Sequence, residues 1–260
     1  MNTLDAVRSI MRKYESLEIS GIRDGQLQRR VSTFMRRSGI PDEADFVSRL
    51  TRDPSLRARM IDALTINVTS VFRNAASWQV LRKELMPRLG SRLKMWSAGA
   101  STGAEAYTMA ICAKENGQHA DIVATDIDQR SLDKALIGRY TTQEIKETPR
   151  DILDKYFTPD GADWVVDPEL RRSIRFRRHD LLAQPAVGSH FDLIACRNVV
   201  IYFSSEAQRD LHRKLADALR PGGILFIGGA ERVANPAAIG LEPGERPFYM
   251  RKETIKAVAV

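Results

Sequence analysis

The sequence predicts an α/β protein with a mostly parallel sheet, preceded by an all-helical N-terminal domain. From about residue 92, short apolar segments alternate with helical segments, which is typical of a parallel sheet covered on both faces. Before about residue 75 the periodic segments are all helical. With 43% hydrophobic and 28% charged residues among 260, the composition is that of an ordinary globular protein. We expect two domains, over residues 1–74 (helical domain and linker) and 75–260.

Apolar residues at helical spacing predict the N-terminal helices. They recur from Leu4 to Tyr14, around Phe46, and from Leu56 to Leu64. Between the first two stretches, Gly25 and Gly39 bracket a further helix. Its apolar face holds Leu27, Val31, Phe34 and Met35, and its opposite face holds Arg29, Arg30, Arg36 and Arg37. This basic face is either an ordinary solvated surface or a docking surface for an acidic partner.

The second domain is predicted to start with a strand over residues 93–99 and a helix over 104–117. Strand 120–128 and helix 131–138 follow. Residues 157–176 break this order with turns and short strands, and predict a small β subdomain. Residues 191–203 read as a strand leading into a loop. A helix from Ser204 then runs to Pro221-Gly222-Gly223, and strand 222–229 closes the series.

The charge balance and the cysteines limit the class of protein. The net charge of +7 favours an acidic partner, which could be nucleic acid, an anionic membrane or an acidic protein surface. Cys112 and Cys196 lie in apolar runs and are interpreted as reduced core thiols, and the four histidines have no zinc spacing, so we expect no metal. No apolar run approaches the ~20 residues of a membrane span, and Asp5 and Arg8 interrupt a signal-peptide pattern. We therefore expect a cytoplasmic protein.

Candidate site residues lie where the first two predicted strands end. Gly99 and Gly103 lie in the first turn and allow close approach of a ligand, but the dinucleotide spacing G-x-G-x-x-G is absent. Glu105 opens the next helix, where it could hold a cation or complement the helix dipole. Asp126 ends the second strand, where an acid can bind both ribose hydroxyls; Asp128 is the alternative. This pattern suits a nucleoside cofactor with a cationic arm, of which S-adenosylmethionine is the common one.

Five segments together resemble the chemotaxis receptor methyltransferases, the CheR family. They run in order over nearly the whole chain, and the motifs N-x-T-x-x-F-R and C-R-N-V-V-I-Y-F are specific. The segments are INVTSVFRNAASW (66–78), WSAGASTGAEAYTMAI (96–111), ATDIDQRSLDKALIGRY (124–140), FDLIACRNVVIYF (191–203) and LRPGGILFIGG (219–229).

The resemblance implies a class I S-adenosylmethionine-dependent methyltransferase fold (Rossmann-like) with an N-terminal helical domain. It implies methyl transfer from S-adenosylmethionine to the γ-carboxylate of particular glutamates on helical chemoreceptors, leaving S-adenosylhomocysteine. Glu105 would hold the methionine amino group, Asp126 the ribose, and Asp180 with Leu181 the adenine. The other implied cofactor residues are Asn67, Thr69, Arg73, Gly99, Arg197 and Asn198.

Arg73 and Tyr202 are implied to lie nearest the transferred methyl group. A glutamate carboxylate is anionic at neutral pH, since its unperturbed pKa is about 4.3, and needs no general base. It needs alignment and a counter-charge, which Arg73 could supply by a charge-assisted bond while Tyr202 orients it through its hydroxyl. Each of these residues also has a purely structural interpretation. Arg73 could be a surface arginine, Tyr202 an aromatic residue of the core, and Glu105 a carboxylate that complements the dipole at the start of a helix.

Some positions depart from the family pattern. Ala104 and Ala106 stand where the family usually has Glu and Pro, Val71 replaces a Phe, and GGAERV replaces Gly-His-Ser-Glu; we expect Ala104 and Val71 to alter the shape of the cleft. In the family the β subdomain can tether a receptor's C-terminal tail, but the loop from Thr158 to Trp164 is short, so this tether is doubtful. The basic helix from Leu27 to Gly39 is the better candidate for receptor contact.

Two other functions fit parts of the pattern. A nucleic-acid or small-molecule methyltransferase is compatible with the positive charge, but only 7% of the residues are aromatic and no aromatic-rich basic strand offers stacking for bases. We therefore expect no nucleic-acid partner and no membrane insertion. A non-catalytic S-adenosylmethionine-binding signalling adaptor is the alternative from another class.

Overall fold

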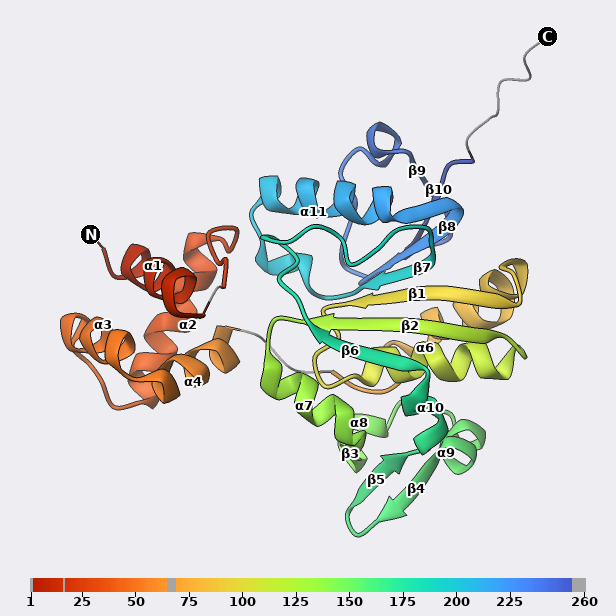
Figure 1. Ribbon diagram of the computed structural model, residues 1–260, viewed down its shortest axis with the longest axis horizontal. Coiled ribbons are helices and arrows are strands. Elements are labelled where there is room, and N and C mark those ends of the chain that lie inside the picture. The colour runs from red at the N-terminus through yellow and green to blue at the C-terminus, as the bar shows by residue number, and fades with distance from the viewer. Residues whose placement is uncertain (1, 16, 65–68, 254–260) are drawn as a thin grey trace.

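The computed structural model describes residues 2–15, 17–64 and 69–253, and its N-terminal part is a helical bundle (Figure 1). The helices are α1 (Thr3–Glu15), α2 (Asp24–Arg37), α3 (Glu43–Arg52) and α4 (Pro54–Leu64). Their apolar faces meet in one core cluster that includes Val7, Leu27 and Phe46. Within the described ranges, no helix has the length and apolar character that crossing a membrane requires. The prediction of an all-helical N-terminal domain is confirmed.

The rest of the chain is built on a seven-stranded sheet with the order β6-β2-β1-β7-β8-β10-β9. Its strands are β1 (Arg92–Ala98), β2 (His119–Asp126), β6 (Ile174–Arg178), β7 (Phe191–Cys196), β8 (Leu219–Ile227), β9 (Leu241–Pro243) and β10 (Phe248–Arg251). Strands β6, β2, β1, β7 and β8 are parallel, and β10 runs antiparallel to β8 and β9. The predicted α/β class with a mostly parallel sheet is confirmed.

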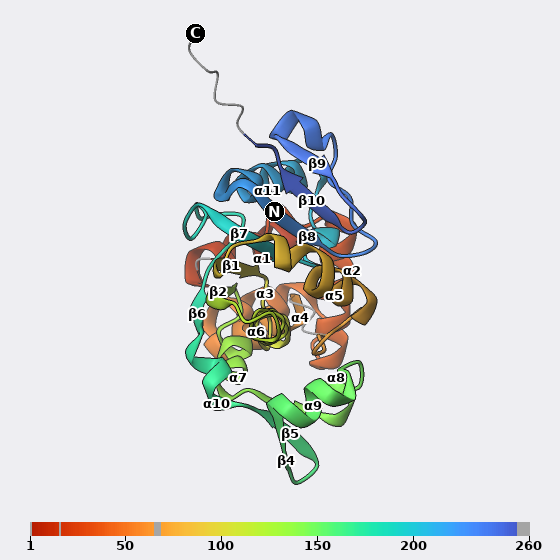
Figure 2. The ribbon, with the colours of Figure 1, turned by 90° about the vertical axis from the view of Figure 1, so that its right-hand side faces the viewer.

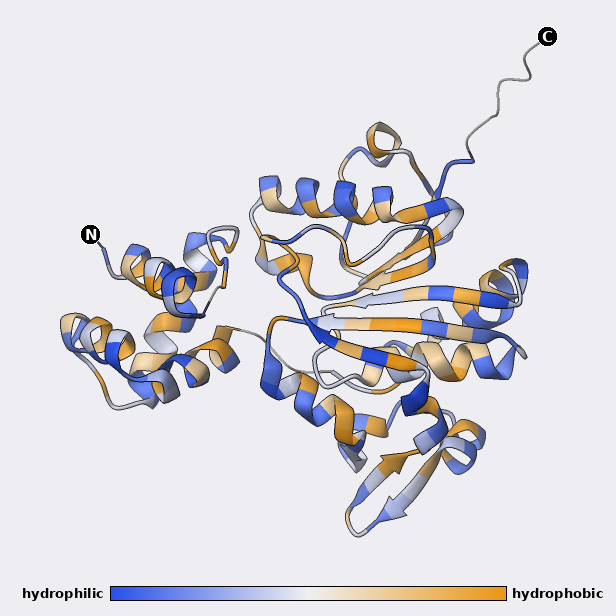
Figure 3. Cartoon of the chain, viewed as in Figure 1, coloured by the Kyte–Doolittle hydropathy of each residue, from blue (hydrophilic) through white to orange (hydrophobic). Residues whose placement is uncertain are grey.

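Helices cover both faces of this sheet. One face carries α5 (Ala75–Val80), the short π-helix η1 (Leu81–Leu85), the short 3-10 helix η2 (Met86–Arg88), α6 (Ala104–Glu115) and α7 (Gln129–Ile137). The other face carries α11 (Ser205–Ala218). In β7, Leu193 belongs to the core on the first face and Ile194 to the core on the second. Figure 3 shows hydrophobic residues along the central strands and on the side of α11 that faces them. Burial on both faces explains why these strands read as continuous apolar runs.

A second, three-stranded sheet lies away from the N-terminal bundle (Figure 1). It has the order β3-β5-β4, and this region contains β3 (Arg139–Thr141), α8 (Thr142–Ile145), α9 (Arg150–Tyr156), β4 (Phe157–Asp160), β5 (Asp163–Val166) and α10 (Pro168–Arg172). The expected β insertion over 157–176 differs from this at both ends. Strand β3 is too short to show a period of two, and Ile174 already pairs with Ile122 of the main sheet.

The junction between α11 and β8 also differs from the prediction. The helix ends at Ala218 rather than at the Pro-Gly-Gly, and β8 begins at Leu219. Pairing of β8 with β7 is irregular between Phe191 and Leu193, and Pro221 falls in this irregular part, where a missing amide hydrogen is tolerated. A Cβ on Gly223 would lie 2.7 Å from the carbonyl oxygen of Phe191, so glycine is required for this close approach.

The two cysteines are core residues, as predicted. Cys112 on α6 and Cys196 at the end of β7 are free thiols with no exposed surface. Burial raises the pKa of Cys112 to about 12 and that of Cys196 well above its usual range. Neither thiol is therefore a reactive thiolate at neutral pH.

The N-terminal bundle lies beyond the carboxyl ends of the parallel strands, and in Figure 2 it is behind the sheet. Ile22 forms an isolated antiparallel bridge with Phe203, and the Arg23 Nε donates to the carbonyl oxygen of Phe203 at 3.1 Å. A salt bridge of 2.8 Å joins Arg130 on α7 to Asp62 on α4. These contacts place the bundle against the edge of the sheet where ligands of open α/β folds bind.

Candidate functional site

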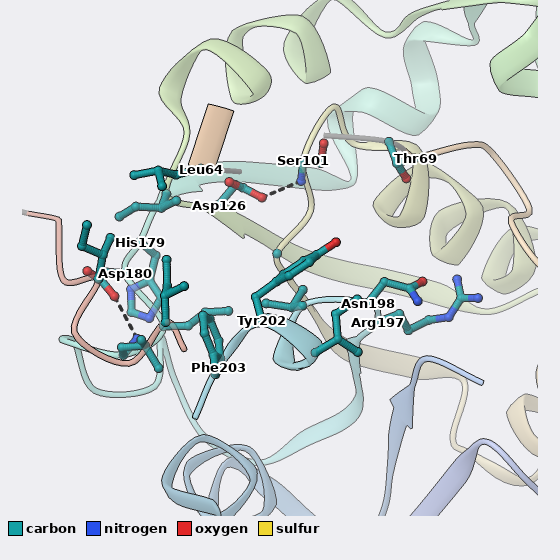
Figure 4. Close-up of a pocket in the computed structure, with 18 of the residues that line it drawn as sticks. Leu64, Thr69, Ser101, Asp126, His179, Asp180, Arg197, Asn198, Tyr202 and Phe203 are labelled. Atoms are coloured by element: carbon teal, nitrogen blue, oxygen red, sulfur yellow. Dashed lines mark hydrogen bonds between the residues drawn. The ribbon is translucent and has the colours of Figure 1, made fainter. Parts of the chain in front are cut away.

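A cleft of about 210 Å³ lies beyond the carboxyl ends of the neighbouring strands β1 and β7. The strand order reverses between these two strands, which is where ligands of open α/β folds bind. Every predicted site residue within the described ranges lines it, while Asn67 lies outside the described residues. Those lining residues are Thr69, Arg73, Gly99, Glu105, Asp126, Asp180, Leu181, Arg197, Asn198 and Tyr202. Figure 4 labels Thr69, Asp126, Asp180, Arg197, Asn198 and Tyr202 among them. Ala104 and Val71, expected to shape the cleft, are instead buried in the core beneath it and do not line it.

The turn between β1 and α6 brings backbone close to the cleft. Gly99 has a φ of +87°, and a Cβ there would lie 2.4 Å from the Cγ2 of Val199. The amides of Gly99 and Ala100 both donate to the carbonyl oxygen of Thr125, each at 2.8 Å. The turn is therefore held against the end of β2, and only glycine fits its first position.

Glu105 lies under this turn as a buried carboxylate. It is 8% exposed, accepts a hydrogen bond from the Ser97 hydroxyl at 2.7 Å, and lies 3.7 Å from the guanidinium of Arg197. Burial raises the pKa of Glu105 to about 7, although Arg197 and Ser97 act in the opposite direction. Water does not stabilise the negative charge of this buried carboxylate. The site therefore favours a cationic ligand group, which would stabilise that charge in place of water.

Asp126 is the acid that ends β2 in the cleft. Its carboxylate accepts hydrogen bonds from the amides of Ser101 at 2.7 Å and Asp128 at 3.0 Å, and burial raises its pKa. Figure 4 shows the first of these bonds. Asp128 does not line the cleft, because its side chain caps α7 by accepting from the Arg130 amide at 3.0 Å. Of the two acids that the sequence left open, the structure places Asp126 in the cleft.

Arg73 lies in a strained loop between the bundle and the sheet domain. Phe72 and Asn74, on either side of it, have φ values of +56° and +62°. The carbonyl oxygen of Arg73 accepts from Trp78 Nε1 at 3.1 Å and from Arg197 Nη2 at 2.8 Å. Left-handed backbone at non-glycine residues persists only where neighbours hold it, so these bonds fix the position of Arg73.

Tyr202 contacts a residue that sequence reasoning placed elsewhere. The guanidinium of Arg30 lies 4.2 Å from the centre of the Tyr202 ring, and Arg30 is 8% exposed and lines the cleft. The prediction that Arg30 lies on the exposed basic face of α2 is therefore wrong. Arg29, Arg36 and Arg37 are exposed as predicted. Burial lowers the pKa of Arg30, and its Nε and Nη2 have no hydrogen-bond partner within the described part of the chain.

The N-terminal domain also supplies part of the cleft wall. The segment Leu17–Ile22 lies over the end of β6, where the Glu18 amide donates to the Asp180 carboxylate at 2.9 Å. The other Asp180 oxygen accepts from the amides of Leu182 and Ala183 at 2.8 and 3.1 Å. Sequence reasoning missed this segment and Arg30, since no local motif marks a contact between two domains.

Comparison with known protein families gives two matches. The all-alpha domain of the CheR methyltransferases matches residues 2–65, and their S-adenosylmethionine-binding domain matches residues 67–244. The chain belongs to the CheR methyltransferase family. It is an S-adenosylmethionine-dependent methyltransferase, and S-adenosylmethionine is its cofactor.

Curated relatives agree with the CheR assignment. The chain is 37% identical over 248 residues to a chemotaxis protein methyltransferase of Listeria innocua, covering 93% of this chain and 94% of the relative. A chemotaxis protein methyltransferase of Listeria monocytogenes is 36% identical over the same length, with the same coverage. Chemotaxis protein methyltransferase 1 of Pseudomonas aeruginosa is 35% identical over 222 residues, covering 79% of this chain and 81% of the relative.

The residues of the cleft fit the CheR cofactor. A buried carboxylate at Glu105 suits an ammonium group, and a second one at Asp126 suits a vicinal diol. Because Gly99 has no side chain, the turn packs directly against Val199, which also lines the cleft.

Cofactor binding should depend on pH through Glu105. Because Glu105 has a pKa of about 7, it is largely protonated below that pH, and a protonated carboxyl cannot pair with an ammonium group. We expect the affinity for S-adenosylhomocysteine to rise from pH 5.5 to 8, with a limiting slope of about tenfold per pH unit below pH 7. Calorimetry in buffers of different ionisation enthalpy should also detect proton release on binding near pH 6.5.

The Glu105→Gln variant is the control for this pH dependence. It should bind more weakly at pH 8 and lose both the slope and the proton release, since the amide does not titrate. The raised pKa of Glu105 also predicts how the stability of the unliganded protein depends on pH. Because the pKa is higher in the folded than in the unfolded state, the free energy of unfolding falls as pH rises from about 4.5 to 7. Cofactor should therefore raise Tm more at pH 8 than at pH 6. A wild-type affinity that is constant between pH 5.5 and 8 would contradict this role of Glu105.

Proposed function

We propose that the protein transfers a methyl group from S-adenosylmethionine to the γ-carboxylate of glutamates on the helices of chemoreceptors. The observation that carries the proposal is the meeting of three side chains from different parts of the chain, Arg73, Arg30 and Tyr202, in the wall of one cleft. Two guanidinium groups and a phenol suit an incoming anionic oxygen. The names of the relatives, chemotaxis protein methyltransferases, support the receptor as the source of that oxygen.

The cofactor would be held by residues at the ends of the first strands. Glu105 pairs with the ammonium group, Asp126 accepts from the ribose hydroxyls, and Asp180 with Leu181 binds the adenine. The remaining contacts are assigned to Asn67, Thr69, Arg73, Gly99, Arg197 and Asn198. When bound, S-adenosylmethionine supplies an electrophilic methyl group on a sulfonium centre.

Arg73 and Tyr202 are the proposed catalytic residues. A substrate carboxylate is already anionic at neutral pH, so no side chain has to remove a proton. Arg73 neutralises and holds one carboxylate oxygen, Tyr202 orients the carboxylate by donating its hydroxyl proton, and Arg30 adds positive charge above the Tyr202 ring. Leu17, Ile19 and Ile22 of the N-terminal domain add apolar surface to the cleft wall.

Methyl transfer from labelled cofactor tests this function. The protein should label receptor-containing membranes and leave RNA unlabelled in a parallel reaction. Mild base should release the label as methanol, because a carboxyl methyl ester is base-labile and a methylated base is not. Label on RNA would favour the nucleic-acid methyltransferase, and cofactor binding with no transfer would favour the signalling adaptor.

The exposed arginines of α2 should dock the receptor. Arg29, Arg36 and Arg37 are exposed on the same helix that carries Arg30 into the cleft, so an acidic receptor helix bound there lies beside the site. Reversing these three residues to Glu should raise the KM for receptor about tenfold or more, with no change in the Kd of S-adenosylhomocysteine. The effect should shrink as ionic strength rises.

A matched control separates docking from net charge. Reversal of Arg88, Arg92 and Arg172 makes the same change in charge at exposed positions outside α2 and the cleft, and should leave the receptor KM unchanged. Equal effects of the two triple variants, or equal loss of receptor methylation and cofactor affinity, would contradict docking by α2.

Receptor tail peptides should bind weakly or not at all. Strands β4 and β5 are joined by only Gly161 and Ala162, so the hairpin offers little loop surface for a peptide. Calorimetry with C-terminal peptides of the receptors from the same cell should give no measurable heat at micromolar protein. A tight complex would contradict this expectation.

A further inference from the structure

Glu231 is a buried acid that lies just behind the cleft and that sequence reasoning did not assign. It follows β8, is 3% exposed, and does not line the cleft. One of its carboxylate oxygens accepts from the amide of Gly228 at 2.6 Å and from the amide of Asn198 at 3.0 Å. The carboxylate thus ties together the carboxyl ends of the neighbouring strands β7 and β8.

The segment held by Glu231 carries three of the proposed site residues. Arg197 and Asn198 follow β7 directly, and Tyr202 ends the short turn η3 (Val200–Tyr202) (Figure 4). Asn198 has a φ of +60°, a conformation that needs support from its surroundings. At the far end of the segment, the Gln208 side chain donates to the carbonyl oxygens of Val200 and Phe203 at 2.9 and 3.0 Å. Glu231 is the corresponding support at the near end.

The packing between Glu231 and Gly228 is tight. A Cβ on Gly228 would lie 2.7 Å from the Glu231 carboxylate oxygen and 3.0 Å from the Asn198 amide nitrogen. A Cβ on the next residue, Gly229, would meet nothing within 4 Å. Burial raises the pKa of Glu231, whereas the backbone amides of Gly228, Asn198 and Ile201 and the nearby Arg197 lower it. The two amide hydrogen bonds to one oxygen partly offset the cost of burying the carboxylate, whose other oxygen has no hydrogen-bond partner within the described residues.

We propose that Glu231 is a positioning residue, which fixes the turn that carries Arg197, Asn198 and Tyr202 by accepting the amides of Asn198 and Gly228. Its effect on methyl transfer rests on the proposed function, whereas its effect on the turn does not. Loss of the carboxylate should free Asn198 to leave its left-handed conformation and displace Tyr202. Transfer should then slow because a misplaced orienting group costs alignment.

Neighbouring glycines provide the first test. Gly228→Ala should displace the Glu231 carboxylate, lower kcat about tenfold or more, and change the KM for S-adenosylmethionine less. Gly229→Ala is the matched control and should behave as the wild type. Hydrogen exchange supplies a second readout: the amide of Asn198 should exchange at least about tenfold faster in Gly228→Ala only. Equal kcat and equal exchange in the two variants would overturn the proposal.

Substitution of Glu231 itself separates the hydrogen bonds from the charge. Glu231→Ala should accelerate exchange at Asn198 and Gly228 and lower kcat about tenfold or more, while Glu231→Gln, which keeps an acceptor oxygen, should restore most of both. Glu245→Gln, at an exposed position near the C-terminus, is the control. If Glu231→Ala does not fold, the proposal is tested with Glu231→Gln, Gly228→Ala and Gly229→Ala. A lower kcat with unchanged amide exchange would refute positioning through the turn.

The exchange experiment also distinguishes the two proposals. If the wild type transfers no methyl group to receptors, the proposed function fails, while faster exchange in Glu231→Ala still supports the role of Glu231 in the turn. If transfer occurs and the exchange is unaffected, the proposed function stands and the role of Glu231 is wrong.

Discussion

Replacing Arg73 with alanine should lower kcat for receptor methylation about 100-fold, while the Kd of S-adenosylhomocysteine changes by only a few-fold. A charge-assisted hydrogen bond contributes about 1.5–3 kcal/mol, which corresponds to a factor of roughly 10 to 150 in rate if the bond is made in the transition state. The loop should keep its shape, because it is the carbonyl oxygen of Arg73 that Trp78 and Arg197 bind. Single-turnover kinetics with saturating cofactor would measure the effect on the chemical step.

The Arg73→Lys variant tests whether a positive charge is sufficient without the planar guanidinium group. Lysine keeps a positive charge but not the planar fork that binds two carboxylate oxygens, so we expect kcat between those of the wild type and the alanine variant. If Arg73→Ala weakens cofactor binding as much as it slows transfer, Arg73 acts only through the cofactor and not on the reacting carboxylate.

Replacing Asp126 with alanine should raise the Kd of S-adenosylhomocysteine about 100-fold. Two charge-assisted hydrogen bonds to the ribose hydroxyls would be lost, at about 1.5 kcal/mol or more each. Calorimetry at pH 8, where Glu105 is ionised, measures the change without interference from that group. Turnover at saturating cofactor should recover much of the wild-type rate, because the reacting carboxylate is bound by other residues.

Asp128→Ala is the matched control for Asp126. It removes the cap of α7, so it should cost about 1 kcal/mol of the free energy of unfolding and leave the Kd within about threefold. The opposite pattern, with weak binding in Asp128→Ala and normal binding in Asp126→Ala, would assign the ribose to Asp128.

Much of the site could be predicted because its residues adjoin strand ends. Gly99 directly follows β1, Asp126 ends β2, and Glu105 lies in the first turn of the helix after β1; parallel strands bring their carboxyl ends to one edge. The strands themselves were visible as apolar runs because both faces of the sheet are covered. The boundaries that failed, such as β3 and the start of β8, are short or irregular, and their pairing depends on partners far away in the chain.

The sequence by itself determined the class of fold, the family and the acids at the strand ends, since each of these is encoded in local patterns or in motifs of fixed spacing. Only the tertiary structure decided which arginine of α2 enters the cleft, that Leu17–Ile22 forms its wall, and that Glu231 holds the turn before Tyr202. A helical pattern places Arg30 on a polar face but does not show what covers that face. Contacts between segments that are distant in the chain depend on how the two domains pack, and no local pattern records that packing.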